Sequence, residues 1–201
     1  MNKLTKLVAA TGNRGKLREI RDLLSPLGVE VLSQGEAGFA GEIVEDGATF
    51  EENALIKARA VARATGLPAI ADDSGLCIDA LHGAPGIYSA RYAGEDAGDA
   101  DRIALLLRNM AEVPDGERGA HFVSALAFCT PEGEEFAVRG ECHGSILRAP
   151  QGTLGFGYDP VFFDPRFQKS FGEIDPDEKN RVSHRAAAMT KFFEKIKEWD
   201  G

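Results

Sequence analysis

The sequence has few cysteines and no long hydrophobic run. Cys77, Cys129 and Cys142 are the only 3 cysteines among 201 residues, and they contain no Cys-x-x-Cys pair. Such usage is typical of a reducing compartment and argues against a disulfide framework or a zinc site. No segment approaches the roughly 18 consecutive apolar residues that a membrane span needs, and residues 7–10 are too short for a signal-peptide core. The sequence therefore predicts a soluble, cytoplasmic protein.

The chain also has fewer basic than acidic residues. Asp and Glu number 32 against 23 Lys and Arg, which gives a formal net charge of −9 and a pI near 5.0. The summed field repels phosphate polymers and anionic membranes, so we expect neither nucleic acid nor a membrane as a partner. A small anion can still bind where the cations gather. Repeats, low-complexity tracts and Ser/Pro-rich linkers are absent, so residues 1–201 are predicted to form a single domain.

Strand-like and helix-like patterns alternate along the first half of the chain. Residues 4–10 predict a short buried strand, and Leu17, Ile20 and Leu24 then recur at helical spacing until Gly28. Further segments are predicted as a strand at 29–32, a helix at 50–62 ended by Gly66, strand-like runs at 69–71 and 76–81, a helix at 103–110 capped by Asp99 or Asp101, a hairpin at 122–142, and a final helix with Met189, Phe192, Phe193, Ile196 and Trp199 on its apolar face. We expect an α/β fold in which helices flank a mixed β-sheet.

The segment Thr11-Gly12-Asn13-Arg14-Gly15-Lys16 lies between the first predicted strand and the first predicted helix. Its two glycines allow a tight turn, the amides at the helix start point outward, and its two cations add positive charge. These features favour a phosphate-binding loop, although the segment matches neither GxxxxGK[ST] nor GxGxxG. The alternative is an ordinary turn with solvated cations.

Two groups of acidic residues differ in how well local structure explains them. Thr49 and Glu52 match a capping box at the start of the second predicted helix. Asp72 and Asp73 stand at a predicted strand end before Ser74 and have no comparable explanation. Carboxylates there suit Mg²⁺, which takes one or two protein carboxylates together with phosphate oxygens and water. One of the pair can instead cap a turn, so we expect one functional aspartate.

The C-terminal part contains a glycine-rich segment and a pair of misplaced cations. Ser183 is a good cap for the final helix, so His184 and Arg185 fall in its first turn, where the helix dipole disfavours cations by about 0.3–1 kcal/mol each. This placement indicates an anion or an acceptor-rich ligand nearby; the alternative is two solvated side chains. Phe156, between two glycines, is either a ring offered to a planar base or a core residue.

Taken in order, these segments resemble the inosine triphosphate pyrophosphatase family of the bacterial type. The resemblance covers nearly the whole chain and rests on ATGNRGKLREI at 10–20, TFEENALIKARA at 49–60, ADDSGLCIDALHGAPGIYSARYAG at 71–94, GFGYDPVF at 155–162 and SHR at 183–185. It implies a mixed α/β fold of two lobes with a nucleotide cleft between them, and a homodimer. It also implies Mg²⁺-dependent hydrolysis of ITP, dITP and XTP to the monophosphate and pyrophosphate, which cleanses the nucleotide pool.

The resemblance also implies roles for individual residues. Asp73 is the general base and a metal ligand, with Glu45 as the second acidic position, and the strand is expected to end so that Asp73 faces the Mg²⁺–triphosphate. Lys16 stabilises charge on the leaving group, and Lys179 or Arg185 donates to the C6 oxygen of the base. The implied substrate-binding residues are Thr11, Gly12, Asn13, Arg14, Gly15 and Lys16 for the triphosphate, Ser74, then Phe156, Gly157, Tyr158 and Asp159 around base and sugar, and Lys179, His184 and Arg185.

Two other functions remain open from the sequence. A related pyrophosphatase acts on modified pyrimidine or methylated nucleotides, and a substrate panel separates it from the function above. A non-catalytic nucleotide sensor keeps the phosphate loop but releases no product.

Overall fold

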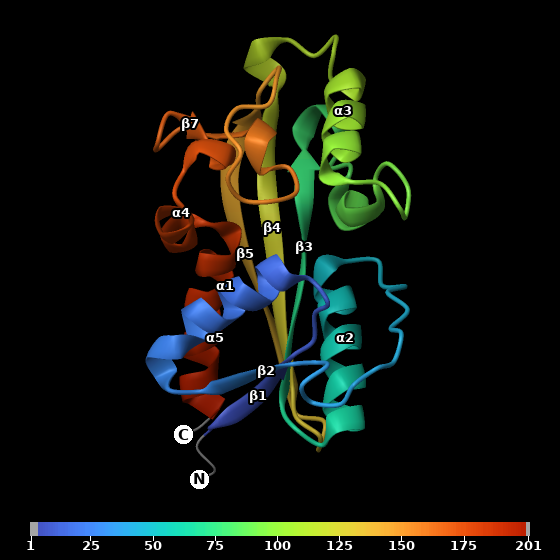
Figure 1. Ribbon diagram of the computed structural model, residues 1–201, viewed down its shortest axis with the longest axis vertical. Helices are drawn as coiled ribbons and strands as arrows, with labels where there is room; N and C mark the ends of the chain where they lie inside the picture. The colour runs from blue at the N-terminus through green and yellow to red at the C-terminus, as the bar shows by residue number, and fades with distance from the viewer. Residues whose placement is uncertain (1–3, 200–201) are drawn as a thin grey trace. The chain divides into compact units, whose positions relative to one another are not determined.

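The computed structural model describes residues 4–199 as a mixed sheet with flanking helices (Figure 1). The seven strands follow the order β2-β1-β3-β4-β5-β6-β7. The strands are β1 (Lys6–Ala9), β2 (Glu30–Ser33), β3 (Ala69–Ile78), β4 (Gly119–Cys129), β5 (Glu135–Ile146), β6 (Phe162–Asp164) and β7 (Lys169–Ser170). The helices are α1 (Arg14–Leu24), α2 (Phe50–Thr65), α3 (Asp99–Asn109), α4 (Pro176–Val182) and α5 (His184–Trp199). No helix within 4–199 is both long and apolar enough to cross a membrane.

The pairing of the strands confirms the predicted mixed sheet. β1 runs parallel to β2 and to β3, with Lys6 opposite Glu30 and Val8 opposite Ala69. β6 is antiparallel to both β5 and β7. β4 and β5 are neighbours joined by a tight turn in which the Thr130 N–H donates to the Glu134 carbonyl, as in the predicted hairpin.

The chain divides into two compact units, and each has its own hydrophobic core. The first unit comprises residues 4–73, 124–140 and 185–199 of the described chain, and the second comprises 74–123 and 141–184. In the first unit α1 and α5 pack on the same core, while Figure 1 shows α2 on the opposite side of the strands from α5. The core of the second unit is rich in aromatic rings, among them Phe122, Phe162 and Phe171. The assignment of residues 1–201 to a single domain stays a prediction.

The ends of α2 are as predicted, and the predicted start of α3 needs a correction. The Thr49 hydroxyl accepts the Glu52 N–H at 3.1 Å at the start of α2, and Gly66 ends that helix with φ +67°. The N-cap of α3 is Gly98, and neither Asp99 nor Asp101 takes that position. Asp101 instead accepts the Gly98 N–H at 3.0 Å from the third position of the helix, so the prediction of an aspartate cap was wrong by one residue.

α5 begins at His184, directly after Ser183, as predicted. Met189, Phe192 and Ile196 of this helix are buried in the core of the first unit. Burial of three such side chains, at about 1.5–3 kcal/mol each, stabilises the docking of the helix. The side chain of Trp199 lies outside the described residues.

The prediction that a strand ends at Asp73 was wrong, because β3 continues from Ala69 through Asp72 and Asp73 to Ile78. Successive side chains of a strand point to opposite faces, so the two carboxylates lie on different sides of the sheet. Each of them meets a cation on its own side, as described below. The charges are therefore compensated without an interruption of the strand.

Candidate active site

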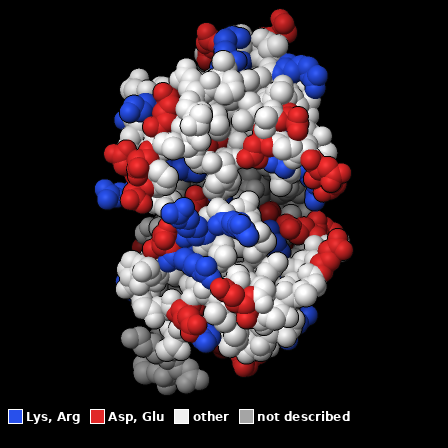
Figure 2. All heavy atoms as spheres, in the orientation of Figure 1, with Lys and Arg blue, Asp and Glu red and all other residues white. Residues whose placement is uncertain are grey.

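The predicted phosphate loop connects β1 to α1. Asn13 is the N-cap of α1, and its Oδ1 accepts the N–H groups of Gly15 at 2.8 Å and Lys16 at 3.1 Å. The Thr11 hydroxyl accepts the Asn13 N–H at 3.1 Å, which fixes the turn before the cap. Figure 2 shows Lys and Arg side chains gathered over α1 on the face displayed, in a protein that is acidic overall. The sequence of the helix carries Arg14, Lys16, Arg18 and Arg21.

Asp72 is the centre of a buried ion network in the first unit. Its carboxylate lies 2.7 Å from Lys16 Nζ and 3.3 Å from Arg185 Nε, and it accepts the Ser124 hydroxyl at 2.6 Å. Burial raises the pKa of Asp72, but Lys16 and Arg185 outweigh this effect and hold the pKa well below its usual range. Arg185 also pairs with Glu19. Asp72 therefore stays ionised and connects two of the predicted substrate-binding cations.

Asp73 has a different environment, although it is the next residue. Its Oδ1 lies 3.0 Å from Lys57 Nζ, and the same ammonium lies 2.8 Å from Glu45 Oε2. Burial raises the pKa of Asp73, and the nearby cations Lys57 and Lys16 only partly counteract it. For Lys57, burial lowers the pKa, but the pull of Asp73 and Glu45 is stronger, so its pKa is raised and it remains a cation.

One oxygen of Asp73 is left without a hydrogen bond. Its Oδ2 is buried and has no hydrogen-bond partner among residues 4–199. An unpaired buried carboxylate oxygen is costly, so it indicates a ligand that binds there. Within the same described range, no three His, Cys, Asp or Glu side chains form a metal cluster, but Mg²⁺ needs only one or two protein carboxylates. Asp73, with Glu45 joined to it through Lys57, fits such a hard cation.

In the second unit, Lys179 is held between a carboxylate and an aromatic ring. Its Nζ lies 2.6 Å from Asp159 Oδ2 and 4.9 Å from the centroid of the Phe156 ring, and only 4% of the residue is exposed. Asp159 Oδ2 also accepts the Phe156 N–H at 2.9 Å. The sequence-predicted residues Phe156, Asp159 and Lys179 are thus brought together by direct contacts.

Two glycines give the segment from Gly155 to Asp159 its shape. Gly155 has φ +77° and Gly157 has φ +62°, a left-handed conformation that favours glycine. A Cβ on Gly155 would meet Asp159 Oδ2 at 2.1 Å, so the close approach of that carboxylate also requires glycine. The Tyr158 hydroxyl donates to the Ser89 carbonyl at 2.8 Å.

The remaining predicted site residues are His184, Ser74 and Gly12. His184 is buried and stacks on Phe122 with ring centroids 4.9 Å apart and an interplanar angle of 18°. Ser74 lies half-buried on β3, directly after Asp73. Gly12 follows Thr11 in the loop before α1.

Sequence reasoning missed three side chains of these networks. Lys57 had a readable signal: it lies between Ala54 and Ala58 on the buried stripe of α2, where a cation needs an acidic partner. Ser124 lies in the buried run of β4, and Glu19 on α1; neither pattern distinguishes them from ordinary polar residues.

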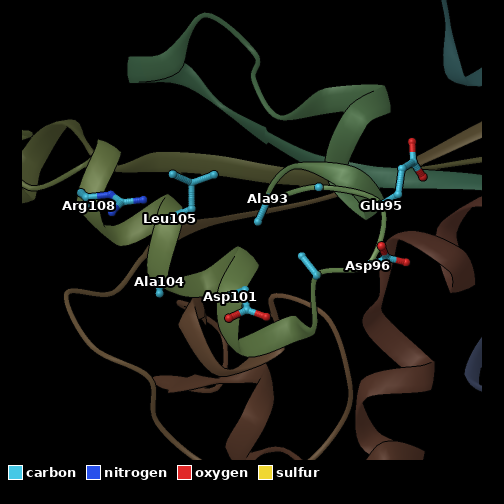
Figure 3. A pocket seen from close by; sticks show the side chains of 9 residues that line it. Ala93, Glu95, Asp96, Asp101, Ala104, Leu105 and Arg108 are labelled. Carbon is cyan, nitrogen blue, oxygen red and sulfur yellow. The ribbon is translucent and has the colours of Figure 1, made fainter.

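A depression of about 640 Å³ lies elsewhere in the second unit, between residues 93–97 and α3. Figure 3 shows Glu95, Asp96 and Asp101 around it, with Arg108 at one end. Three carboxylates against one guanidinium repel a triphosphate. None of the predicted site residues lines this depression.

Comparisons with known proteins agree with the fold. Proteins named dITP/XTP pyrophosphatase from Lactiplantibacillus plantarum and Vibrio cholerae are each 49% identical to this chain, over 99% and 97% of its length and 98% of theirs. A solved structure of a HAM1 protein from Coxiella burnetii matches with a TM-score of 0.87 at 42% identity, covering 96% of this chain and 99% of that one. A nucleoside-triphosphatase, dITP/XTP pyrophosphatase, from Mycobacterium abscessus matches with a TM-score of 0.76 at 47% identity, covering 94% and 98%.

These names confirm the resemblance on which the residue roles were based. The model of the Ham1 family matches residues 7–195, a span that contains every residue discussed above as part of the site, and the chain belongs to that family.

Proposed function

We propose that this protein hydrolyses ITP, dITP and XTP to the nucleoside monophosphate and pyrophosphate. The observation that carries the proposal is Asp73, a buried carboxylate with one oxygen unpaired among the described residues, beside Lys57 and Glu45. The relatives named dITP/XTP pyrophosphatase support the substrate class. The enzyme is a hydrolase of the bond between the α and β phosphates.

Asp73 acts as the general base. Burial raises its pKa from the ordinary value of an aspartate, which makes the carboxylate a stronger proton acceptor. Lys57 holds Oδ1 at 3.0 Å, so the other oxygen is the one directed at a water that attacks the α-phosphorus. Asp73 and Glu45 would hold Mg²⁺, which supplies positive charge against the triphosphate oxygens when bound.

Lys16 and Arg14 bind the triphosphate from the loop before α1. Lys16 approaches from the first turn of the helix, where outward N–H groups also favour an anion. Its ammonium lies 2.7 Å from Asp72, and this contact fixes the side chain before substrate arrives. A preorganised cation stabilises the charge that shifts to the departing pyrophosphate.

Lys179 is the donor that selects the base. Its ammonium is positioned by Asp159 and Phe156, and it would donate to the C6 oxygen of inosine or xanthine. Adenine has an amino group at C6, so the buried donor loses this partner with ATP, which can discriminate by about 10⁴-fold or more. Arg185 was the alternative donor, but its guanidinium is 2% exposed and paired with Asp72 and Glu19. We propose that Arg185 supports the pocket through those carboxylates.

A homodimer and a cytoplasmic location belong to the same proposal. Both are supported by the family resemblance, and the location also by the absence of a Cys-x-x-Cys pair.

The test is incubation of the pure protein with ITP and, separately, ATP in Mg²⁺, with independent assays for pyrophosphate and orthophosphate. We expect pyrophosphate and IMP from ITP and almost no product from ATP. Orthophosphate as the product would contradict cleavage between the α and β phosphates. Binding of ITP without product would favour a sensor, and turnover of modified pyrimidine nucleotides alone would favour the pyrimidine-directed alternative.

A further inference from the structure

We infer that Tyr158 and Asp99 are positioning residues that lock the loop from Gly155 to Asp159, and that this lock sets the discrimination between bases. The inference rests on the proposed function and concerns residues beyond the donor Lys179 itself. Tyr158 was expected to lie around base and sugar, and the inference gives its hydroxyl the role of a support for the loop.

The first part of the lock is the buried contact between Tyr158 and Ser89. The Tyr158 hydroxyl donates to the Ser89 carbonyl at 2.8 Å, and each residue is only 5% exposed. Ser89 is itself immobilised, because its hydroxyl accepts the Leu76 N–H at 2.9 Å and donates to the Gly86 carbonyl at 2.6 Å. Burial raises the pKa of Tyr158, so the hydroxyl keeps the proton that it donates.

The second part is a carboxylate from the first turn of α3. Asp99 Oδ2 accepts the Gly157 N–H at 2.8 Å. The other oxygen pairs with Arg102, whose second terminal nitrogen donates to the Ala97 carbonyl at 2.6 Å. The carboxylate is therefore held on both sides before it meets the loop.

The loop needs this support because of its own sequence. Gly155 and Gly157 both adopt left-handed conformations, and glycine samples many other backbone conformations when it is not constrained. Between them lies Phe156, whose N–H is bound by the same Asp159 oxygen that pairs with Lys179. A shift of the loop thus displaces the aromatic ring and the counter-ion of the proposed base donor together.

The predicted signature is a change at the base end of the substrate with no change at its phosphate end. Tyr158→Phe removes one oxygen and with it the hydrogen bond to the Ser89 carbonyl. If the correct loop conformation then falls to about a tenth of the molecules, KM for ITP rises about tenfold while kcat stays within about threefold. ATP uses the ring of Phe156 but not the C6 contact, so its KM rises less than that of ITP and the ITP-over-ATP ratio of kcat/KM falls. The inhibition constant of inorganic tripolyphosphate, which has no base, stays within about twofold of the wild-type value.

Tyr92→Phe is the matched control for this variant. The Tyr92 hydroxyl accepts the Asn109 side-chain N–H at 2.7 Å in the same unit, and the residue packs on the same core; this hydrogen bond goes to the end of α3 and not to the loop. It loses one tyrosine hydrogen bond, as Tyr158→Phe does. We expect its KM and base selectivity to stay within about twofold of wild type.

Three further variants test the contact with Gly157. Asp99→Ala removes the acceptor, and Asp99→Asn keeps one carbonyl oxygen for the Gly157 N–H while losing the charge that binds Arg102. Asp101→Ala weakens the start of α3 to a similar degree, because Asp101 binds the Gly98 N–H. We expect Asp99→Ala to raise KM for ITP about threefold or more, Asp99→Asn to restore most of the loss, and Asp101→Ala to leave KM unchanged.

The outcomes separate this inference from the function on which it rests. If wild-type protein turns over ITP but Tyr158→Phe has the same KM and ITP-over-ATP ratio as Tyr92→Phe, the lock is refuted and the proposed function stands. An equal weakening of tripolyphosphate and ITP would also refute it, because the change would then not be confined to the base. Failure of the wild type to hydrolyse ITP would overturn both.

Discussion

Replacement of Asp73 by asparagine separates the chemistry of this residue from its contribution to stability. The substitution keeps the size of the side chain and removes the charge that accepts the proton. Lys57 keeps its contact with Glu45 at 2.8 Å, so the lysine is not left as an isolated buried cation. General base catalysis contributes about 10²–10⁴-fold, so we expect kcat for ITP to fall by at least that factor.

The thermal stability of Asp73→Asn is not expected to fall together with its kcat. Burial raises the pKa of Asp73, so the folded protein holds this proton more tightly than the unfolded chain does. The stability linked to this group is complete below the unfolded-state pKa and is lost as pH rises through the folded-state pKa. Ionisation of Asp73 therefore costs stability, and its ion pair with Lys57, whose pKa Asp73 helps to raise, offsets part of that cost. An uncharged asparagine should leave Tm equal to or above that of wild type.

Asp72→Asn is the contrasting control, because it makes the same chemical change one residue away. Asp72 is fully buried and pairs with Lys16 and Arg185, and its pKa is held below the usual range. Breaking a buried pair from one side costs about 3–5 kcal/mol. For a chain of this size that lowers Tm by about 10 °C, at about 2–4 °C per kcal/mol.

The assay is steady-state hydrolysis of ITP, with thermal unfolding of both variants measured in the same buffer at pH 7. A kcat near wild type for Asp73→Asn would remove this residue from the mechanism. A fall in Tm as large as that of Asp72→Asn would show that the carboxylate of Asp73 stabilises the fold, which contradicts the direction of its pKa.

Three further substitutions and one pH titration test the rest of the site. Lys179→Met, which removes the donor but keeps much of the apolar stem, should reduce the ITP-over-ATP ratio of kcat/KM by at least tenfold, and an unchanged ratio would place base recognition elsewhere. Lys57→Met leaves Asp73 and Glu45 without their cation, which raises the pKa of Asp73 further. The acidic limb of the kcat–pH profile should therefore move to higher pH. Gly155→Ala introduces a Cβ 2.1 Å from Asp159 Oδ2 at φ +77°, and KM for ITP should rise while tripolyphosphate inhibition is unchanged. Because the folded-state pKa of Asp72 is lowered, this carboxylate stabilises the fold above about pH 4, and its contribution is lost on further acidification. The free energy of unfolding should therefore fall between pH 6 and pH 3 in the wild type, and it should fall less in Asp72→Asn.

The elements of the fold were predictable where the sequence pattern is strong. The stripe of α2 with Thr49 and Gly66 at its ends, the hairpin of β4 and β5, and the start of α5 after Ser183 were all visible in the sequence. Their signals are local: hydrophobic period, capping side chain and turn residue. The order of strands in the sheet depends on contacts between distant segments, and no local pattern encodes it.

The candidate site was predictable in its parts but not in its pairings. The motifs pointed to Lys16, Asp73, Lys179 and Arg185, but not to the partner of each. Lys57 was overlooked because a lysine on a helix is usually solvated, and only its place among buried alanines marked it. Arg185 was expected to face a ligand, and the structure shows it bound to Asp72 and Glu19.

The pair of adjacent aspartates shows why a strand interior can carry two charges. Two neighbouring carboxylates inside a strand would leave at least one charge badly placed, so either the strand ends there or the charges have a partner; the sequence was interpreted as a strand end before Ser74. The alternation of β3 instead sends Asp72 to Lys16 and Arg185 and sends Asp73 to Lys57. The first carboxylate meets two cations and its pKa is lowered; the second meets one close cation that it shares with Glu45, and its pKa is raised. A single dipeptide thus places an ionised carboxylate beside Lys16, the lysine that we propose binds phosphate, on one face, and the carboxylate that we propose as the general base on the other. An interruption of the strand would have loosened both, since the geometry of each pair depends on the continuous backbone between them.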